Sequence, residues 1–149
     1  MLEYQRSETA ATLGEGLAEY YASCTGLVRE RGVSGRAREF FACHDAAHVV
    51  FGCSTELLDE ARVKLWSVFG TTGGLALLRE YRLPEAKELY QELDWGPIAT
   101  TALRGLVAVP VVLVRCARMK KRWPWAAHER YRRASLREIR QEYGIRVVT

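Results

Sequence analysis

The chain has 149 residues, of which 48% are hydrophobic and 27% are charged. This length can bury one hydrophobic core, and this composition excludes an intrinsically disordered protein. The net charge of +4 is unevenly spread, because residues 115–133 hold eight basic residues and one acid. A basic segment of this kind suits phosphate groups on lipid or nucleic acid, or else is a solvated helical face.

Good helix formers dominate the chain, which has only four prolines. We therefore predict an all-α fold, with residues 1–149 forming a single compact domain. Gly52 is expected to end one helix, and Ser54 or Thr55 to cap the next. The pattern predicts about seven helical segments, at residues 8–23, 35–51, 56–69, 74–81, 84–93, 97–122 and 126–143.

The segment 97–122 is the most apolar part of the chain. Arg104, Pro110 and Arg115 interrupt it, so no uncharged run reaches the roughly 18–20 residues that span a bilayer. The segment is interpreted as a buried helix kinked at Pro110, or as one that lies partly on a membrane.

The amino-terminal residues contain several glutamates and no basic stretch before an apolar one, which argues against a secretory or mitochondrial leader. The four cysteines include no Cys-x-x-Cys pair. These features favour a bacterial cytoplasmic protein with reduced thiols.

The stretch "HDAAH" places titratable side chains within an apolar helix. Each helical residue advances by about 100°, so Asp45 lies about 100° and His48 about 40° from His44. Two imidazoles at i and i+4 can bind one metal ion. Asp45 could complete the coordination of that ion, or orient one of the histidines without binding the ion itself. Eleven residues after His48, Glu60 would return beside the histidines if two consecutive helices pack together. Such a donor set suits zinc, iron or manganese.

Other interpretations of the same residues remain open. The histidines could be core side chains bonded to carbonyls. Glu60 could pair with Lys64, and Asp59 with Arg62, as ordinary ion pairs. Cys43 and Cys53 could form a rival ligand set with the histidines, although buried inert thiols fit better.

Motifs of several other protein classes are absent from the sequence. We find no Walker-type phosphate loop, no Gly-x-Ser-x-Gly elbow, and no zinc-finger or RNP pattern, so no nucleic-acid partner is expected. Tryptophans beside lysines near residue 123 fit a membrane interface at least as well.

"HDAAH", eleven residues and then Glu60 resembles the HDxxH-x11-E pattern of the coenzyme Q biosynthesis protein 4 family. The stretch "VVFGCSTELLDEARVKLWSVFGTTGG" and the ending "RWPWAAHERYRRASLREIRQEYGI" are also similar to that family, so the resemblance covers residues 38–146. One departure is Asp59, where many members have glycine.

The resemblance implies an all-helical protein that holds a divalent metal on a helix-turn-helix pair. It implies zinc, or iron, manganese or magnesium, as the cofactor, bound by His44, Asp45, His48 and Glu60. It further implies a lyase of ubiquinone biosynthesis, which removes the carboxylate from ring carbon 1 of a polyprenylated hydroxybenzoate with oxidation at that carbon. The expected partners are the prenylated lipid, other pathway enzymes, a second copy in a homodimer, and the inner face of the bacterial inner membrane.

Such a substrate and membrane suggest further candidate residues. Phe41, Phe51, Trp66 and the run 106–114 could line a groove for a prenyl tail. The membrane-facing candidates are Lys120, Lys121, Arg122 and Trp123. Two other functions are considered: a non-catalytic scaffold that binds metal and lipid, and a metal-dependent phosphohydrolase. The latter usually needs further histidines, and the remaining one, His128, is expected on the surface.

Overall fold

The computed structural model describes residues 1–23, 35–81 and 98–147, with only the backbone described for 98–107. The fold is all-α, as predicted, and the described residues contain no β-strand beyond two isolated bridges. The α-helices are α1 (Leu13–Ser23), α2 (Gly35–Phe51), α3 (Leu57–Leu65), α4 (Leu77–Glu80), α6 (Ile98–Ala117), α7 (His128–Tyr131) and α8 (Leu136–Tyr143). Short helical turns are η1 (Glu3–Gln5), η4 (Gly74–Ala76), η5 (Trp125–Ala127) and the π-helical η3 (Trp66–Gly70).

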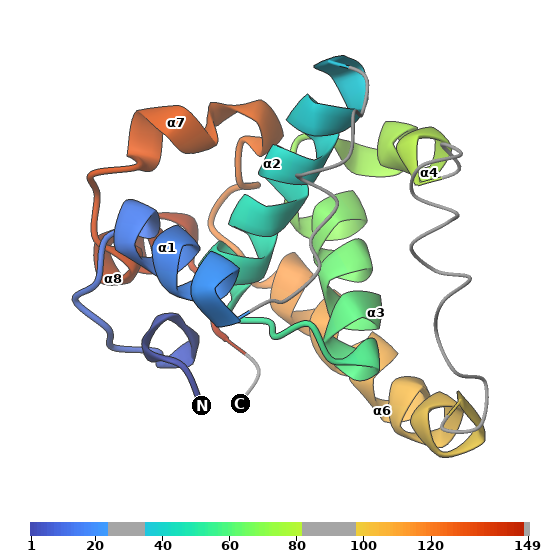
Figure 1. Ribbon diagram of the computed structural model, residues 1–149. Helices are drawn as coiled ribbons and strands as arrows, with labels where there is room; N and C mark the ends of the chain where they lie inside the picture. Colours follow the sequence, from blue (N-terminus) through green and yellow to red (C-terminus); the bar gives the residue numbers. More distant parts are fainter. Residues whose placement is uncertain (24–34, 82–97, 148–149) are drawn as a thin grey trace.

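Helix α2 is the central element of the fold. It lies between α1 and α3, while α6 packs along the far side of α3 (Figure 1). All nine residues from Cys43 to Phe51 are buried. A helix buried on nearly every side has no solvated face to carry polar residues. The histidines of α2 therefore lie inside the protein.

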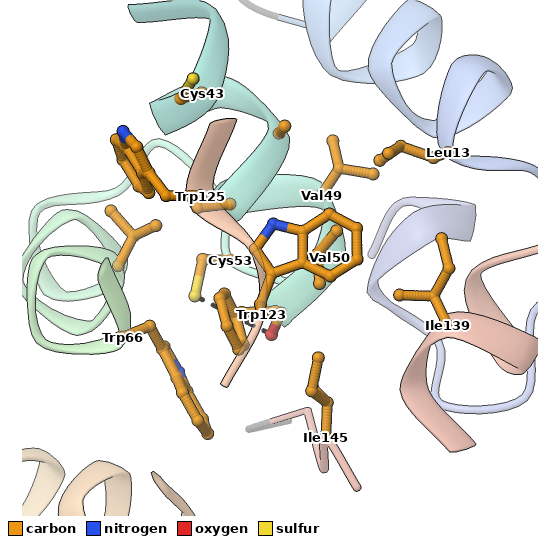
Figure 2. Packing of buried hydrophobic residues seen from close by; sticks show 14 of the residues in the cluster. Leu13, Cys43, Val49, Val50, Cys53, Trp66, Trp123, Trp125, Ile139 and Ile145 are labelled. Atoms are coloured by element: carbon orange, nitrogen blue, oxygen red, sulfur yellow. Dashed lines mark hydrogen bonds between the residues drawn. The ribbon is translucent and has the colours of Figure 1, made fainter. Parts of the chain in front are cut away.

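The core beside α2 is rich in aromatic side chains. Phe51 stacks on Trp66 of η3, with ring centroids 4.5 Å apart. Trp123 is fully buried, and Figure 2 shows its indole among Val50, Cys53 and neighbouring apolar groups. Burying such large rings stabilises the packing of α2, η3 and the segment before α7 against one another.

The turn between α2 and α3 follows the prediction at Gly52 but not at the predicted cap. Neither Ser54 nor Thr55 caps α3, because its N-cap is Glu56, with no side-chain cap bond, and the Ser54 hydroxyl donates to Asp59 instead. Helix α2 has the predicted bounds, and Gly52 adopts a φ of 71° directly after it. A side chain at Gly52 would also collide with Val147, since a Cβ there would lie 2.8 Å from its Cγ1. Glycine is thus required both by the left-handed backbone and by the close packing.

Two helix starts differ from the prediction, and both are set by capping boxes. Helix α1 begins at Leu13 rather than near residue 8, because Thr12 and Glu15 bond each other's backbone N–H groups. The expected helix 126–143 is divided into α7 and α8. Ser135 and Glu138 form a second box that begins α8. Both follow the Ser/Thr-x-x-Glu pattern typical of helix N-termini.

The apolar segment also differs in extent. Helix α6 contains Pro110 as expected but ends at Ala117, five residues before the predicted end. The helix expected at 84–93 lies outside the described residues. Of the helices that the structure describes, none combines enough length and hydropathy to cross a bilayer.

Candidate metal centre

Three predicted ligands converge between α2 and α3. His44 and His48 project from consecutive turns of α2, and Glu60 projects from the first turn of α3. Their ligand atoms all lie within 4.8 Å of one another. Nε2 of His48 is 3.1 Å from Oε1 of Glu60 and 3.2 Å from Nε2 of His44. The remaining pair, Nε2 of His44 and Oε2 of Glu60, is 3.6 Å apart.

This spacing fits a small divalent ion. Two ligand atoms that each lie about 2.0–2.1 Å from zinc at a tetrahedral angle are roughly 3.3 Å apart. The three distances of 3.1, 3.2 and 3.6 Å bracket that value. Two imidazoles and a carboxylate form a donor set found in zinc enzymes, with a fourth position left for water or substrate. The residues present therefore fit a metal ion.

The outer nitrogen of each imidazole has its own partner. Nδ1 of His48 lies 3.4 Å from the carbonyl oxygen of Cys53, and Nδ1 of His44 lies 3.1 Å from the hydroxyl of Tyr81. With an ion bound, the Nδ1 of each ring would carry the proton and face its partner, which would leave the lone pair of Nε2, the atom that faces the other ligands, for the ion. These contacts orient both rings for metal binding.

The electrostatics of the centre favour deprotonated ligands. Burial by itself would raise the pKa of Glu60, but its bonds to His44 and His48 outweigh burial and lower the pKa well below the ordinary value. Burial lowers the pKa of His44, and the bond to Glu60 opposes this only in part. For His44 and Glu60, these shifts favour the neutral imidazole and the ionised carboxylate, which are the forms that bind metal.

The other two acids of the motif lie outside this group. Asp45 is buried on α2, but its carboxylate is not among the converging ligand atoms. Asp59 accepts hydrogen bonds from the backbone N–H and hydroxyl of Ser54, at 2.7 and 2.8 Å. It also pairs with Arg62 at 2.6 Å, which confirms that predicted bridge. Asp59 thus fastens the turn that precedes α3, rather than supplying a further ligand.

The third histidine is not where the sequence placed it. His128 was expected on the surface, but its side chain is only 12% exposed, and its Nδ1 lies 3.7 Å from Sγ of Cys43. Burial raises the pKa of the Cys43 thiol to about 11. Cys43 and Cys53 are both buried free thiols and neither joins the group of ligand atoms, so the rival ligand set does not form in the described structure.

The predicted lipid-contact residues are dispersed. Phe41 is half-buried beside Phe40, whereas Phe51 and Trp66 are fully buried against each other and present no surface to a ligand in this structure. Lys120, Lys121 and Arg122 are exposed, but Trp123 is wholly buried and cannot face a membrane. The prediction for Trp123 is wrong because its indole fills the core beside Tyr131 and Tyr143.

Tyr81 is the site residue that sequence reasoning missed. It follows α4 at its C-terminal end, 21 residues after Glu60, and its hydroxyl contacts His44. No spacing rule links a tyrosine at this separation to the motif, because packing of α4 against η3 brings it back to α2.

No family model, no characterised protein and no solved structure matches this chain in comparisons with known proteins. The resemblance to the coenzyme Q biosynthesis protein 4 family therefore rests on the motif and the flanking segments of the sequence.

Proposed function

We propose that this chain binds a divalent metal ion, with zinc the best fit, through His44, His48 and Glu60. The observation that carries the proposal is the convergence of the three ligand atoms from two helices in a mostly buried place. Iron, manganese and magnesium are alternatives that accept some of the same donors.

We further propose that the metal serves a decarboxylase of ubiquinone biosynthesis acting on a polyprenylated hydroxybenzoate. The resemblance of the motif supports this substrate and the removal of its ring carboxylate with oxidation at carbon 1. A bound divalent ion supplies a Lewis acid for a carboxylate or phenolate oxygen. Glu60, whose lowered pKa keeps it ionised, would supply the negative charge that holds such an ion beside the two histidines.

The partners of this activity are proposed on the same resemblance: the prenylated lipid, the other enzymes of the pathway, a second copy of the chain, and the inner face of the bacterial inner membrane. Exposed apolar side chains on α6, namely Val109, Leu113 and Val114, lie in the same sequence region as the exposed cations Lys120, Lys121 and Arg122. Apolar groups beside cations suit contact with an anionic lipid surface.

A non-catalytic scaffold is the second candidate. His48 has no exposed surface and the Glu60 side chain is only 19% exposed. A metal held so deeply can stabilise the α2–α3 pair without meeting a substrate, as structural zinc ions do. The metal-dependent phosphohydrolase gains no comparable support, because His128 lies beside Cys43 rather than at the centre.

Complementation of a deletion strain separates enzyme from scaffold. We expect the strain to accumulate a prenylated precursor that keeps its ring carboxylate, as seen by mass spectrometry of lipid extracts. The native chain and the Glu56→Gln control should restore quinone, since Glu56 is exposed and makes no cap bond. Glu60→Gln should not. If the Glu60→Gln protein lacks metal but restores full quinone levels, the proposed enzymatic function is wrong and the scaffold is favoured. Hydrolysis of phosphate esters, lost in the same variant, would favour the phosphohydrolase.

A further inference from the structure

A hollow unconnected with the metal ligands lies between the end of α6 and the segment that follows α8. It has a volume of about 560 Å³. Among the described residues, six cationic side chains line it, and Glu8 is the single carboxylate. The cations are Arg115, Arg118, Lys120, Arg137, Arg140 and Arg146. An excess of positive charge in a concave place concentrates the field on whatever anion enters it.

Three of these cations, Arg140, Arg137 and Lys120, are bonded to the wall of the hollow. Arg140 is buried and donates to the carbonyl oxygens of four residues: Tyr4, Arg6, Val49 and Val50. Arg137 lies 3.9 Å from the carboxylate of Glu8 and donates to its carbonyl. Lys120 donates to the carbonyl oxygen of Gln141 at 2.9 Å. These groups shape the wall of the hollow and fix it to the rest of the fold.

The other three arginines surround a smaller recess. A space of about 140 Å³ is lined by Arg115, Arg118, Gly144 and Arg146, all of which also line the larger hollow. This is roughly the volume of four or five water molecules, at about 30 Å³ each. It is enough for a group of a few heavy atoms.

The charges at this recess are not paired with a carboxylate of the described residues. Within the part of the chain that the structure describes, none of Arg115, Arg118 and Arg146 forms an ion pair with a carboxylate. Arg115 donates to the carbonyl oxygens of Arg146 and Val147, which holds it in place beside the C-terminal segment. Burial and then the nearby charge of Arg146 lower the pKa of Arg115, because the two guanidinium groups repel each other. Like charges held together, with no ion-paired carboxylate among the described residues, favour a bound anion.

We propose that this recess binds a phosphate group, which Arg118 and Arg146 contact directly beside the fixed Arg115. Planar guanidinium groups donate paired hydrogen bonds that match phosphate oxygens. Binding would connect the end of α6 to the segment that follows α8. The chain after α6 already contacts the end of α8, where the N–H of Lys120 donates to the carbonyl oxygen of Tyr143. The phosphate could come from a soluble phosphate or diphosphate, or from a lipid headgroup.

The test measures binding of inorganic phosphate, pyrophosphate, and vesicles of phosphatidylcholine with and without phosphatidic acid. It uses the full chain in its purified state, by calorimetry for the soluble anions and by sedimentation for the vesicles. The pocket variant is Arg118→Ala/Arg146→Ala. The control, Arg38→Ala/Arg133→Ala, removes the same charge from two exposed arginines that do not line the hollow and that lie outside the proposed lipid-contact surface. Circular dichroism and metal content should be unchanged in both variants.

We expect the pocket variant to lose at least about tenfold in affinity, and the control to change by less than about twofold. Loss of affinity for phosphate or pyrophosphate would identify a soluble ligand. Loss confined to vesicles with phosphatidic acid would identify a lipid headgroup. Equal loss in both variants would show a non-specific charge effect and overturn the proposal. Binding that persists in the pocket variant would place the anion elsewhere, for example at the metal centre, and would also overturn it. No binding of any probe to the native chain would do the same.

Discussion

The carboxylate of Asp59 accepts hydrogen bonds from both the backbone N–H and the hydroxyl of Ser54, at 2.7 and 2.8 Å. This contact closes the turn between the two helices that carry the candidate ligands. Because Glu60 follows Asp59 directly on the first turn of α3, the same contact fixes where Glu60 points. The residue next to the ligand is thus a determinant of the ligand's position.

Substitution of Asp59 should therefore weaken metal binding without removing a ligand. We expect Asp59→Ala to lower the free energy of unfolding by about 1–2 kcal/mol, the order of magnitude for lost side-chain hydrogen bonds. Metal affinity should fall as Glu60 loses its support. Urea unfolding and a competitive zinc titration would measure the two effects. Glu56→Ala, at an exposed neighbouring position, is the control. Unchanged affinity in Asp59→Ala would contradict the role given to this turn.

The three histidines should differ in their effect on metal content. We expect His44→Gln and His48→Gln to abolish binding of one metal per chain, because each removes one of three converging ligand atoms. His128→Gln should retain the metal, since His128 contacts Cys43 instead. Elemental analysis of the three purified variants tests this directly. A fully loaded His48→Gln protein would refute the assigned ligand set.

Tyr81 should act on the metal through His44. Tyr81→Phe removes the hydroxyl that lies 3.1 Å from Nδ1 of His44, and a lost partner of this kind typically costs about 10–100-fold in metal affinity. The control is Tyr131→Phe, which removes a hydroxyl bonded to Tyr143 at 2.5 Å, away from the centre. Zinc titrations of both variants should separate them. Equal affinities would show that Tyr81 does not orient the ring.

Arg140 should be a major contributor to stability. Its guanidinium is the shared donor to carbonyls at the end of α2 and in the amino-terminal segment. Arg140→Met would leave these carbonyls without that donor, so we expect a loss of at least about 3 kcal/mol in the free energy of unfolding. Arg133→Met, at an exposed position just before α8, should cost less than about 0.5 kcal/mol. Urea unfolding of both variants would measure the difference. Similar losses of unfolding free energy would argue against a special contribution of Arg140 to stability.

Acidification should destabilise the metal-free chain. The pKa of His44 lies below its unfolded value of 6.5, so the unfolded state takes up this proton first and stability falls as the pH drops below that value. The lowered pKa of Glu60 acts in the same direction below its unfolded value of 4.5. Urea unfolding with a chelator at pH 7, 6 and 5 should show a falling free energy, by up to about 1.4 kcal/mol per pH unit from His44. The His44→Gln variant should show a weaker dependence of stability on pH. A native chain whose stability rises on acidification would contradict the prediction.

The sequence by itself determined most of the local structure. The bounds of α2 follow from glycines and helix formers, and Gly52 ends it where the left-handed backbone requires. The i, i+4 spacing of His44 and His48 already placed them on one face. The starts of α1 and α8 were also encoded, in the Thr12–Glu15 and Ser135–Glu138 capping boxes, although the predicted segments 8–23 and 126–143 did not use them.

Only the tertiary structure decided which side chains meet. Packing of α3 on α2 brings Glu60 to the histidines and leaves Asp45 outside, and packing of α4 adds Tyr81. The same packing buries Trp123 and gives His128 a thiol partner. Helical spacing fixes directions only within one helix. Contacts between helices depend on crossing angles and on the volumes of buried rings, which no short pattern in the chain encodes.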